Sequence, residues 1–291
     1  MTMQPPPLSN PVPGSAPAYR SYFANNQVSF GKLVRSEAIK LWTIRSTYWC
    51  LGLSLLGILG FALLTSFAMS SQINSASNGV SVSELVGTSD LSVVAAFFAA
   101  SGVGLVQLIL VVQGSLLIGG EYATGMIRST MSADPKRWRA LIAKATVLSG
   151  FAFVLSLVML IISYFISSAV FSSVDLQTDL WHGESWRMIF GGALFLGLIS
   201  IFAVMLSAIT RNSAGGIGLS MALLLVVPPI LSVIPGDVFK EISKFFPGAG
   251  VTIAYPQDLA EFSPWQDLLI TVAWVTVISV IAIFAIKKRD V

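Results

Sequence analysis

The chain has 291 residues, of which 55% are hydrophobic and only 11% are charged. Because a soluble domain carries roughly 25% charged residues, this composition predicts a polytopic membrane protein. The net charge of +3 gives no support for a general affinity for nucleic acid. One cysteine and one histidine supply neither a disulfide framework nor a cysteine- or histidine-based metal cluster.

The first segment, residues 1–26, is rich in proline, serine and asparagine. Such a composition buries too little apolar surface to offset the entropy lost on ordering, so we expect a disordered cytoplasmic tail. The first apolar run begins only near Tyr48, after a polar and basic leader, and it is too long for a signal peptide. We therefore expect that run to be a retained membrane span and residues 27–291 to form one membrane domain.

An amphipathic helix is predicted over residues 30–43. Its apolar side chains recur at helical spacing, and its basic side chains fall on the opposite face, which suits a helix lying in the membrane surface. Glu37 lies on the apolar face, where a carboxylate needs a partner. Two ion-pair partners for Glu37 remain as alternatives. One is Lys40, three residues later on the same helix, and the other is a basic group elsewhere in the chain or on another protein.

Six apolar runs follow, each long enough to cross roughly 30 Å of hydrocarbon. We expect spans at about Thr47–Ser70, Leu91–Gly119, Leu141–Phe171, Met188–Ile209, Ala214–Ile234 and Leu268–Ile286. The second and third exceed a single crossing, so we expect them to tilt or to extend beyond the bilayer. Pro228 and Pro229 interrupt the fifth span and predict a kink or a half-helix there.

The basic residues give the orientation. Of the 17 lysines and arginines, all but Arg187, Lys240 and Lys244 fall on the side of the two termini. The positive-inside rule then places both termini in the cytoplasm. On the outer side, residues 237–246 have apolar and charged faces at helical spacing, which predicts a short external amphipathic helix before the last span. The expected fold is therefore an all-α membrane protein with six transmembrane helices.

Strongly charged side chains are nearly absent from these spans. Lys144, near the cytoplasmic end of the third, is the only Asp, Glu, His, Arg or Lys inside them. Because proton relays and ion-coupled pathways need ionisable groups at depth, this inventory disfavours a proton-coupled transporter. Gln107 and Gln113 either line a pathway or bond a neighbouring helix. The sequence has no G-x-x-x-x-G-K-[ST] phosphate loop, so we expect no ATPase or other enzymatic activity of its own.

The most charged internal segment is residues 120–140, between the second and third spans. Glu121 ends the second span, and Gly125 divides the connection that follows. Asp134 and Pro135 are typical of the N-cap and first turn of a helix, so the third span is predicted to begin inside the cytoplasm. We expect this segment to present Glu121, Tyr122, Thr124 and Arg128 to a soluble partner. The alternative for its basic residues is simple anchoring on the cytoplasmic side.

These motifs resemble those of ABC transporter permeases of the type-two exporter class. The resemblance rests on Gly120-Glu121-Tyr122 with Gly125, on Pro135 and Arg137 before the third span, and on Glu37, Lys40, Arg45 and Trp49 near the N-terminus. It extends to Lys288-Arg289-Asp290 after the last span and covers residues 30–291 in topology. The chain departs from the pattern at Met126, where these permeases more often have threonine.

The resemblance implies a permease subunit in the bacterial plasma membrane that forms a homodimer or heterodimer. It implies that a separate cytoplasmic ATPase subunit carries the ATP and magnesium, and that the pair exports a lipid, drug or peptide-like substrate. Residues 30–43 would be an elbow helix with Glu37, Lys40 and Arg45, and residues 120–140 a coupling loop. The coupling residues would be Glu121, Tyr122, Thr124, Gly125, Arg128, Asp134, Pro135 and Arg137, with Gln107, Gln113, Pro228 and Pro229 along a candidate pathway.

Two other functions share this topology. A membrane scaffold or regulatory subunit without transport would present the same partner surface. A secondary transporter or channel would work without ATP, and the scarcity of charges within the spans speaks against it.

Overall fold

The computed structural model describes residues 29–75, 82–127, 138–256 and 263–288. Within these ranges every regular element is helical. The predicted disordered tail, residues 1–26, lies outside the described residues. So do Arg128, Asp134, Pro135 and Arg137.

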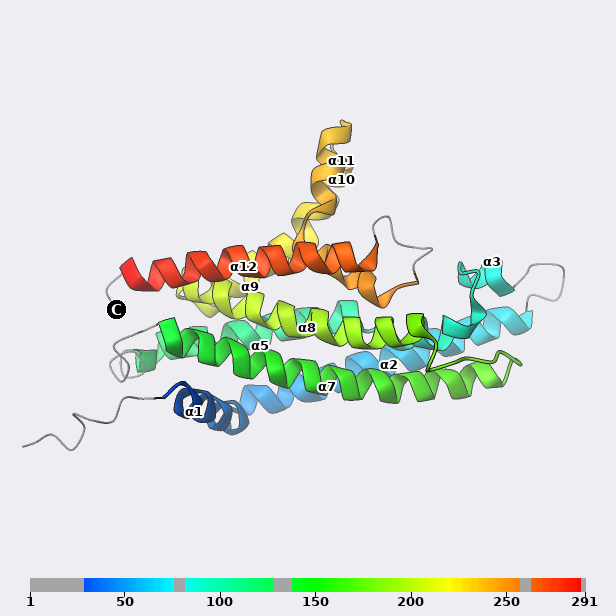
Figure 1. Cartoon of the computed structure of the whole chain (residues 1–291), viewed down its shortest axis with the longest axis horizontal. Helices are drawn as coiled ribbons and strands as arrows, with labels where there is room; N and C mark the ends of the chain where they lie inside the picture. The colour runs from blue at the N-terminus through cyan, green and yellow to red at the C-terminus, as the bar shows by residue number, and fades with distance from the viewer. Residues whose placement is uncertain (1–28, 76–81, 128–137, 257–262, 289–291) are drawn as a thin grey trace, which may run out of the picture.

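Among the described residues, six helical segments are long and apolar enough to cross a membrane, as predicted. They are α2 (Arg45–Ser75), the segment Leu91–Ala123, α7 (Trp138–Ser172), α8 (Gly183–Thr210), the segment Ser213–Val233 and α12 (Pro264–Lys288). The long helices run side by side along one axis (Figure 1). The chain is therefore a helical, multi-pass membrane protein.

The centre of the bundle is formed by α5 (Val103–Ala123) and α8. In the most apolar 18-residue stretch of each span, 67% of the residues are buried in Leu91–Ala123 and 78% in Gly183–Thr210. In Ser213–Val233 the share is only 17%. Glycines permit the closest approaches: a methyl group on Gly114 of α5 would lie 3.1 Å from the carbonyl oxygen of Ser200 on α8. Small residues at helix contacts are the usual means of tight packing in membranes, where water does not drive helices together.

The second apolar run is not one straight helix. It consists of a 3₁₀ turn (Leu91–Val93), α4 (Val94–Ala100) and α5, with a break at Ser101 and Gly102. At Gly102 a side chain would come within 2.7 Å of the carbonyl oxygen of Gly57 on α2. The break thus lies where the backbones of two helices meet.

The fifth run is also broken, as the two prolines predicted. α9 (Ser213–Met221) leads into a π-helical segment (Ala222–Val226) and then into α10 (Val227–Val233), which contains Pro228 and Pro229. A proline has no backbone N–H to donate to the carbonyl of the preceding turn, and its ring clashes with that carbonyl. α10 and the following α11 (Asp237–Lys244) point away from the bundle (Figure 1). The predicted external amphipathic helix corresponds to α11.

The chain returns to the bundle through a 3₁₀ segment (Pro247–Ala254) that packs against α8 and α12. Thr271 of α12 donates to the carbonyl oxygen of Pro247 at 2.9 Å, and Trp274 donates to that of Phe245 at 2.6 Å. Arg187 of α8 holds the far end by donating to the carbonyl oxygens of Ile253 and Tyr255. The base of the α10–α11 hairpin is therefore fixed to the bundle.

At one end of the bundle, α1 (Phe30–Thr43) crosses the direction of the long helices and packs on α7. Figure 1 shows α1, the C-terminal end of α5 and the C-terminal end of α12 at this same end. The short α3 (Val82–Val86) lies at the other end. The helix predicted over residues 30–43 is present with the same bounds, while its position relative to a membrane stays a prediction.

Candidate functional site: a buried charge cluster

The charge cluster consists of Glu37, Lys40, Glu121 and Lys144, which come from three separate helices at one end of the bundle. α1 positions Glu37 through its register. Leu33, Glu37 and Leu41 lie at i, i+4 and i+8 and form its buried face, which packs on α7. The carboxylate of Glu37 is therefore directed into the protein between two buried leucines, and a charge in that position needs a partner.

Lys144 of α7 supplies the main partner. Its side chain is 3% exposed, and its Nζ donates to Oε2 of Glu37 and to Oε1 of Glu121, the latter at 2.8 Å. Glu121 lies two residues before the end of α5 at Ala123. One ammonium group thus joins α1, α5 and α7.

Lys40 bridges the same two carboxylates from the more exposed side. Its Nζ lies 2.8 Å from Oε1 of Glu37 and 3.1 Å from Oε1 of Glu121. Partial burial alone would lower the pKa of Lys40, but the hydrogen bond that Lys40 donates to Glu37 and the charges of Glu121 and Glu37 outweigh it and raise that pKa. Two carboxylates and two ammonium groups therefore form a neutral, alternating arrangement.

Loss of any one charge from the cluster is expected to destabilise the protein. Removing one member of a buried ion pair typically costs about 3–5 kcal/mol, because it strands the remaining charge away from water. Oε2 of Glu121 is buried and has no hydrogen-bond partner among the described residues. The cluster consequently fixes α1 against the beginning of the 120–140 segment, and any displacement of Glu121 disturbs both lysines.

Both partners considered for Glu37 are present. Lys40 provides the local ion pair and Lys144 the distant one. The expectation that Glu121 faces a soluble partner differs from the structure, where Glu121 is 4% exposed. The physical reason is that Lys144 lies on the adjacent helix and neutralises it. In this chain Glu121 lies beneath the surface of the 120–140 segment.

The other predicted coupling residues that the structure describes lie just beyond the cluster. Tyr122 is half-buried, whereas Thr124 is exposed and donates to the carbonyl oxygen of Gly120 at 2.9 Å. Gly125 has a φ of 71°, the left-handed conformation that ends many helices and that glycine adopts without strain. Arg45, the first residue of α2, is exposed and is not part of the cluster.

The candidate pathway residues do not come together in one place. Gln107 and Gln113 are both buried on α5, and among the described residues Oε1 of the first and Nε2 of the second lack hydrogen-bond partners. Pro228 and Pro229 lie on α10, which has no buried residues and leaves the bundle. The two glutamines therefore lie inside the bundle and the two prolines on the hairpin, and a pathway role for these residues stays a prediction.

Sequence reasoning did not assign Lys144 to a site. The sequence nevertheless carried a signal, because Lys144 is the only Asp, Glu, His, Arg or Lys within the predicted spans, and a charge at such a depth requires a partner of opposite sign.

Comparison of the sequence with protein-family models and with curated proteins finds no match. The resemblance to ABC transporter permeases is therefore carried by the motifs of this sequence, and what it implies about function is a proposal.

Proposed function

We propose that this chain is the membrane-spanning subunit of an ATP-driven exporter, which receives mechanical work from a separate ATPase subunit at its cytoplasmic side. The substrate class is a lipid, drug or peptide-like molecule, and the working unit contains a second permease subunit, identical or homologous. The proposal rests on the family resemblance together with the six apolar helical segments.

The observation that best supports the proposal is the charge cluster. A coupling device must connect the surface that a soluble motor touches with the helices that move. Lys144 and Lys40 tie Glu121, at the base of the 120–140 segment, to α1 and α7. Because buried ion pairs hold only in good geometry, these three helices are expected to move as a unit.

In the proposed cycle, closure of two ATPase subunits on ATP displaces the 120–140 segment. The displacement passes through Glu121 and Lys144 to α5 and α7, and through Lys40 and Glu37 to α1. A substrate path between the two permease subunits then opens outward. We expect replacement of Glu121 or Gly125 to abolish coupling while the protein still inserts into the membrane.

Site-specific photo-crosslinking tests the docking step. A benzophenone amino acid replaces Met126, which is 45% exposed beside the cluster, or Trp181, which is 83% exposed near the opposite end. We expect the first variant to form an adduct in native membranes with a subunit that contains a phosphate-loop motif. The second variant is the control and should form no such adduct.

An adduct of that ATPase at Trp181 but not at Met126 would reverse the proposed orientation. Absence of an ATPase adduct at both positions, with both variants correctly inserted, would remove the support for a motor partner and favour a scaffold or an ATP-independent transporter.

A further inference from the structure

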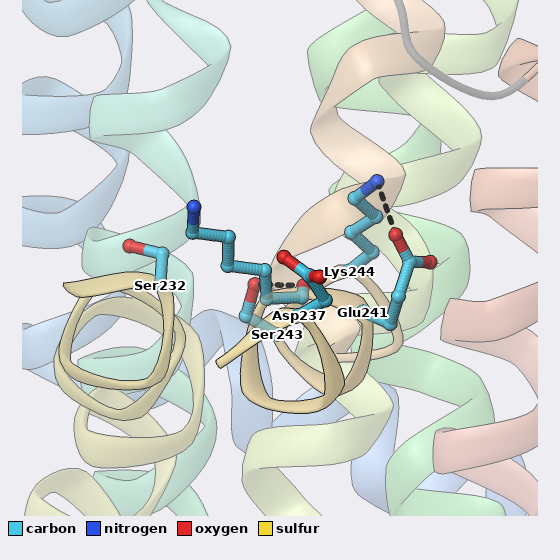
Figure 2. Close-up of a pocket in the computed structure, with 6 residues that line it drawn as sticks. Ser232, Asp237, Glu241, Ser243 and Lys244 are labelled. Carbon is cyan, nitrogen blue, oxygen red and sulfur yellow. Dashed lines mark hydrogen bonds and ion pairs between the residues drawn. The ribbon is translucent and has the colours of Figure 1, made fainter. Parts of the chain in front are cut away.

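A polar groove lies on the α10–α11 hairpin, away from the charge cluster. It is an open depression of about 350 Å³, lined by Ser232, Asp237, Lys240, Glu241, Ser243 and Lys244. Figure 2 shows Asp237 between Ser232, which lies on the neighbouring helix, and the Glu241–Lys244 pair on the far side of α11. The volume is at the lower end of the range for small-molecule sites.

The groove contains two opposite charges that no described residue neutralises. Glu241 and Lys244 pair with each other at 3.0 Å. Asp237 and Lys240 form no ion pair with any residue in the described part of the chain, and both are exposed. One carboxylate and one ammonium group are thus available to a ligand that carries a positive and a negative charge.

The two serines are available only as acceptors. Ser232 donates its proton to the carbonyl oxygen of Pro229 at 2.8 Å, and Ser243 donates to that of Lys240 at 2.7 Å. A hydroxyl oxygen that has donated its proton still accepts through its lone pairs. Together with Asp237, the groove therefore offers several acceptors to a group with several N–H donors.

The surroundings of the groove are apolar. On the opposite face of α11, Val238, Phe239, Ile242 and Phe245 are all at least 41% exposed, and on α10 Ile230 and Val233 are 56% and 81% exposed. A short helix with one charged and one apolar face lies at the boundary between headgroups and acyl chains. We therefore expect the polar groove to face the headgroup layer and its apolar flanks to face the acyl chains.

We propose that this groove binds the headgroup of a membrane phospholipid of the phosphoethanolamine type. Lys240 takes the phosphate, while Asp237 and the oxygens of Ser232 and Ser243 accept hydrogen bonds from the primary ammonium group. A choline headgroup carries the same charges but donates no N–H bond, so it satisfies fewer of these acceptors. The hairpin, held at its base by Thr271 and Trp274, presents this site to the bilayer.

Lipid titration of the purified full-length chain, followed by native mass spectrometry, tests this assignment with phosphatidylethanolamine, phosphatidylcholine and phosphatidylglycerol. We expect the ethanolamine lipid to bind about tenfold more tightly than the choline lipid, the ratio expected from one additional hydrogen bond to a charged group. Asp237→Asn should remove that preference. Lys240→Gln should weaken the binding of all three lipids.

Two exposed residues outside the groove provide matched controls, Asp175→Asn and Lys287→Gln, which should leave the preference intact. An ethanolamine lipid with a photoreactive group should label residues 230–245 in the wild type, which locates the site independently of the variants. Equal binding of the ethanolamine and choline lipids, or a preference unchanged by Asp237→Asn, would overturn the proposal. Preferential binding of the glycerol lipid would overturn it in favour of a simple attraction of anions to the lysines.

Discussion

Lys144 is the residue on which the charge cluster depends most, because it bonds both carboxylates and is almost fully buried. Glu37 and Glu121 would repel each other across a poorly solvated space without it, because Lys40 alone brings one positive charge to two negative charges. The stability of the bundle end should therefore respond strongly to this one side chain.

We predict that Lys144→Met lowers the free energy of unfolding by about 3–5 kcal/mol, since methionine keeps the volume and removes the charge. Thermal unfolding of the detergent-solubilised protein measures this. Lys287→Met, at an exposed position of α12, is the control and should change stability by less than about 0.5 kcal/mol. Adding Glu37→Gln to Lys144→Met should recover part of the loss, because one stranded carboxylate is then neutral. A double variant less stable than Lys144→Met alone would contradict an ionic origin.

Gly125 provides a second prediction at the same scale. Its φ of 71° costs a residue with a side chain about 1–2 kcal/mol, and no atom lies close enough to obstruct a methyl group. Gly125→Ala should therefore destabilise the end of α5, whereas Gly125→Asn, which tolerates the left-handed conformation, should cost less. Hydrogen exchange of the amides at residues 120–127 measures the difference. Equal exchange in the two variants would show that backbone conformation at this residue is unimportant.

At the scale of elements, two adjacent glycines of α5 have opposite surroundings. A methyl group on Gly119 would lie 2.6 Å from Cα of Ser213, the first residue of α9, whereas one on Gly120 would meet nothing within 4 Å. The contact between α5 and α9 thus depends on the absence of a side chain at only one of these positions.

We predict that Gly119→Ala destabilises the protein by about 1–3 kcal/mol, because the backbone of α9 must shift to admit the methyl group. Gly120→Ala should be neutral or stabilising by up to about 1 kcal/mol, since alanine favours the helix over glycine. Thermal unfolding of the two variants side by side compares them directly. A Gly120→Ala variant as unstable as Gly119→Ala would indicate that flexibility, and not the close approach of α9, explains both glycines.

Local patterns predicted the elements well. The spacing of apolar residues predicted the bounds of α1 and the face that it buries. The two prolines predicted the break in the fifth apolar run. The burial of Glu121 was not predictable in the same way, because its partners lie 81 residues before it and 23 residues after it. Such contacts depend on how helices pack, and helical periodicity carries no information about that. The break at Gly102 was not predicted from the sequence for the same reason, since it reflects the approach of α2.

At the scale of the whole molecule, the described ends of α1, α5 and α12 lie at one end of the bundle. The distribution of lysine and arginine predicts that this end is cytoplasmic. The orientation decides whether the charge cluster is accessible to a cytoplasmic motor.

Cysteine labelling of intact cells tests this orientation. The chain has one cysteine, Cys50, which is buried and can be replaced by alanine to give a cysteine-free background. We predict that a membrane-impermeant maleimide labels Asp175→Cys from outside and labels Thr124→Cys only after the cells are opened, since both positions are exposed on the protein. The reverse pattern would place the charge cluster outside the cell and refute the proposed docking.

We propose that this chain obtains its driving force from a separate ATPase through the segment that begins at Glu121. The most direct test is ATP hydrolysis by the complex purified from native membranes through a tag on this chain. We predict that the complex hydrolyses ATP, that the chain stripped of its partner does not, and that Gly125→Ala lowers the hydrolysis while the partner stays bound. Transport of a substrate by the stripped chain alone, or purification without any ATPase subunit from membranes that hold the intact protein, would contradict the account.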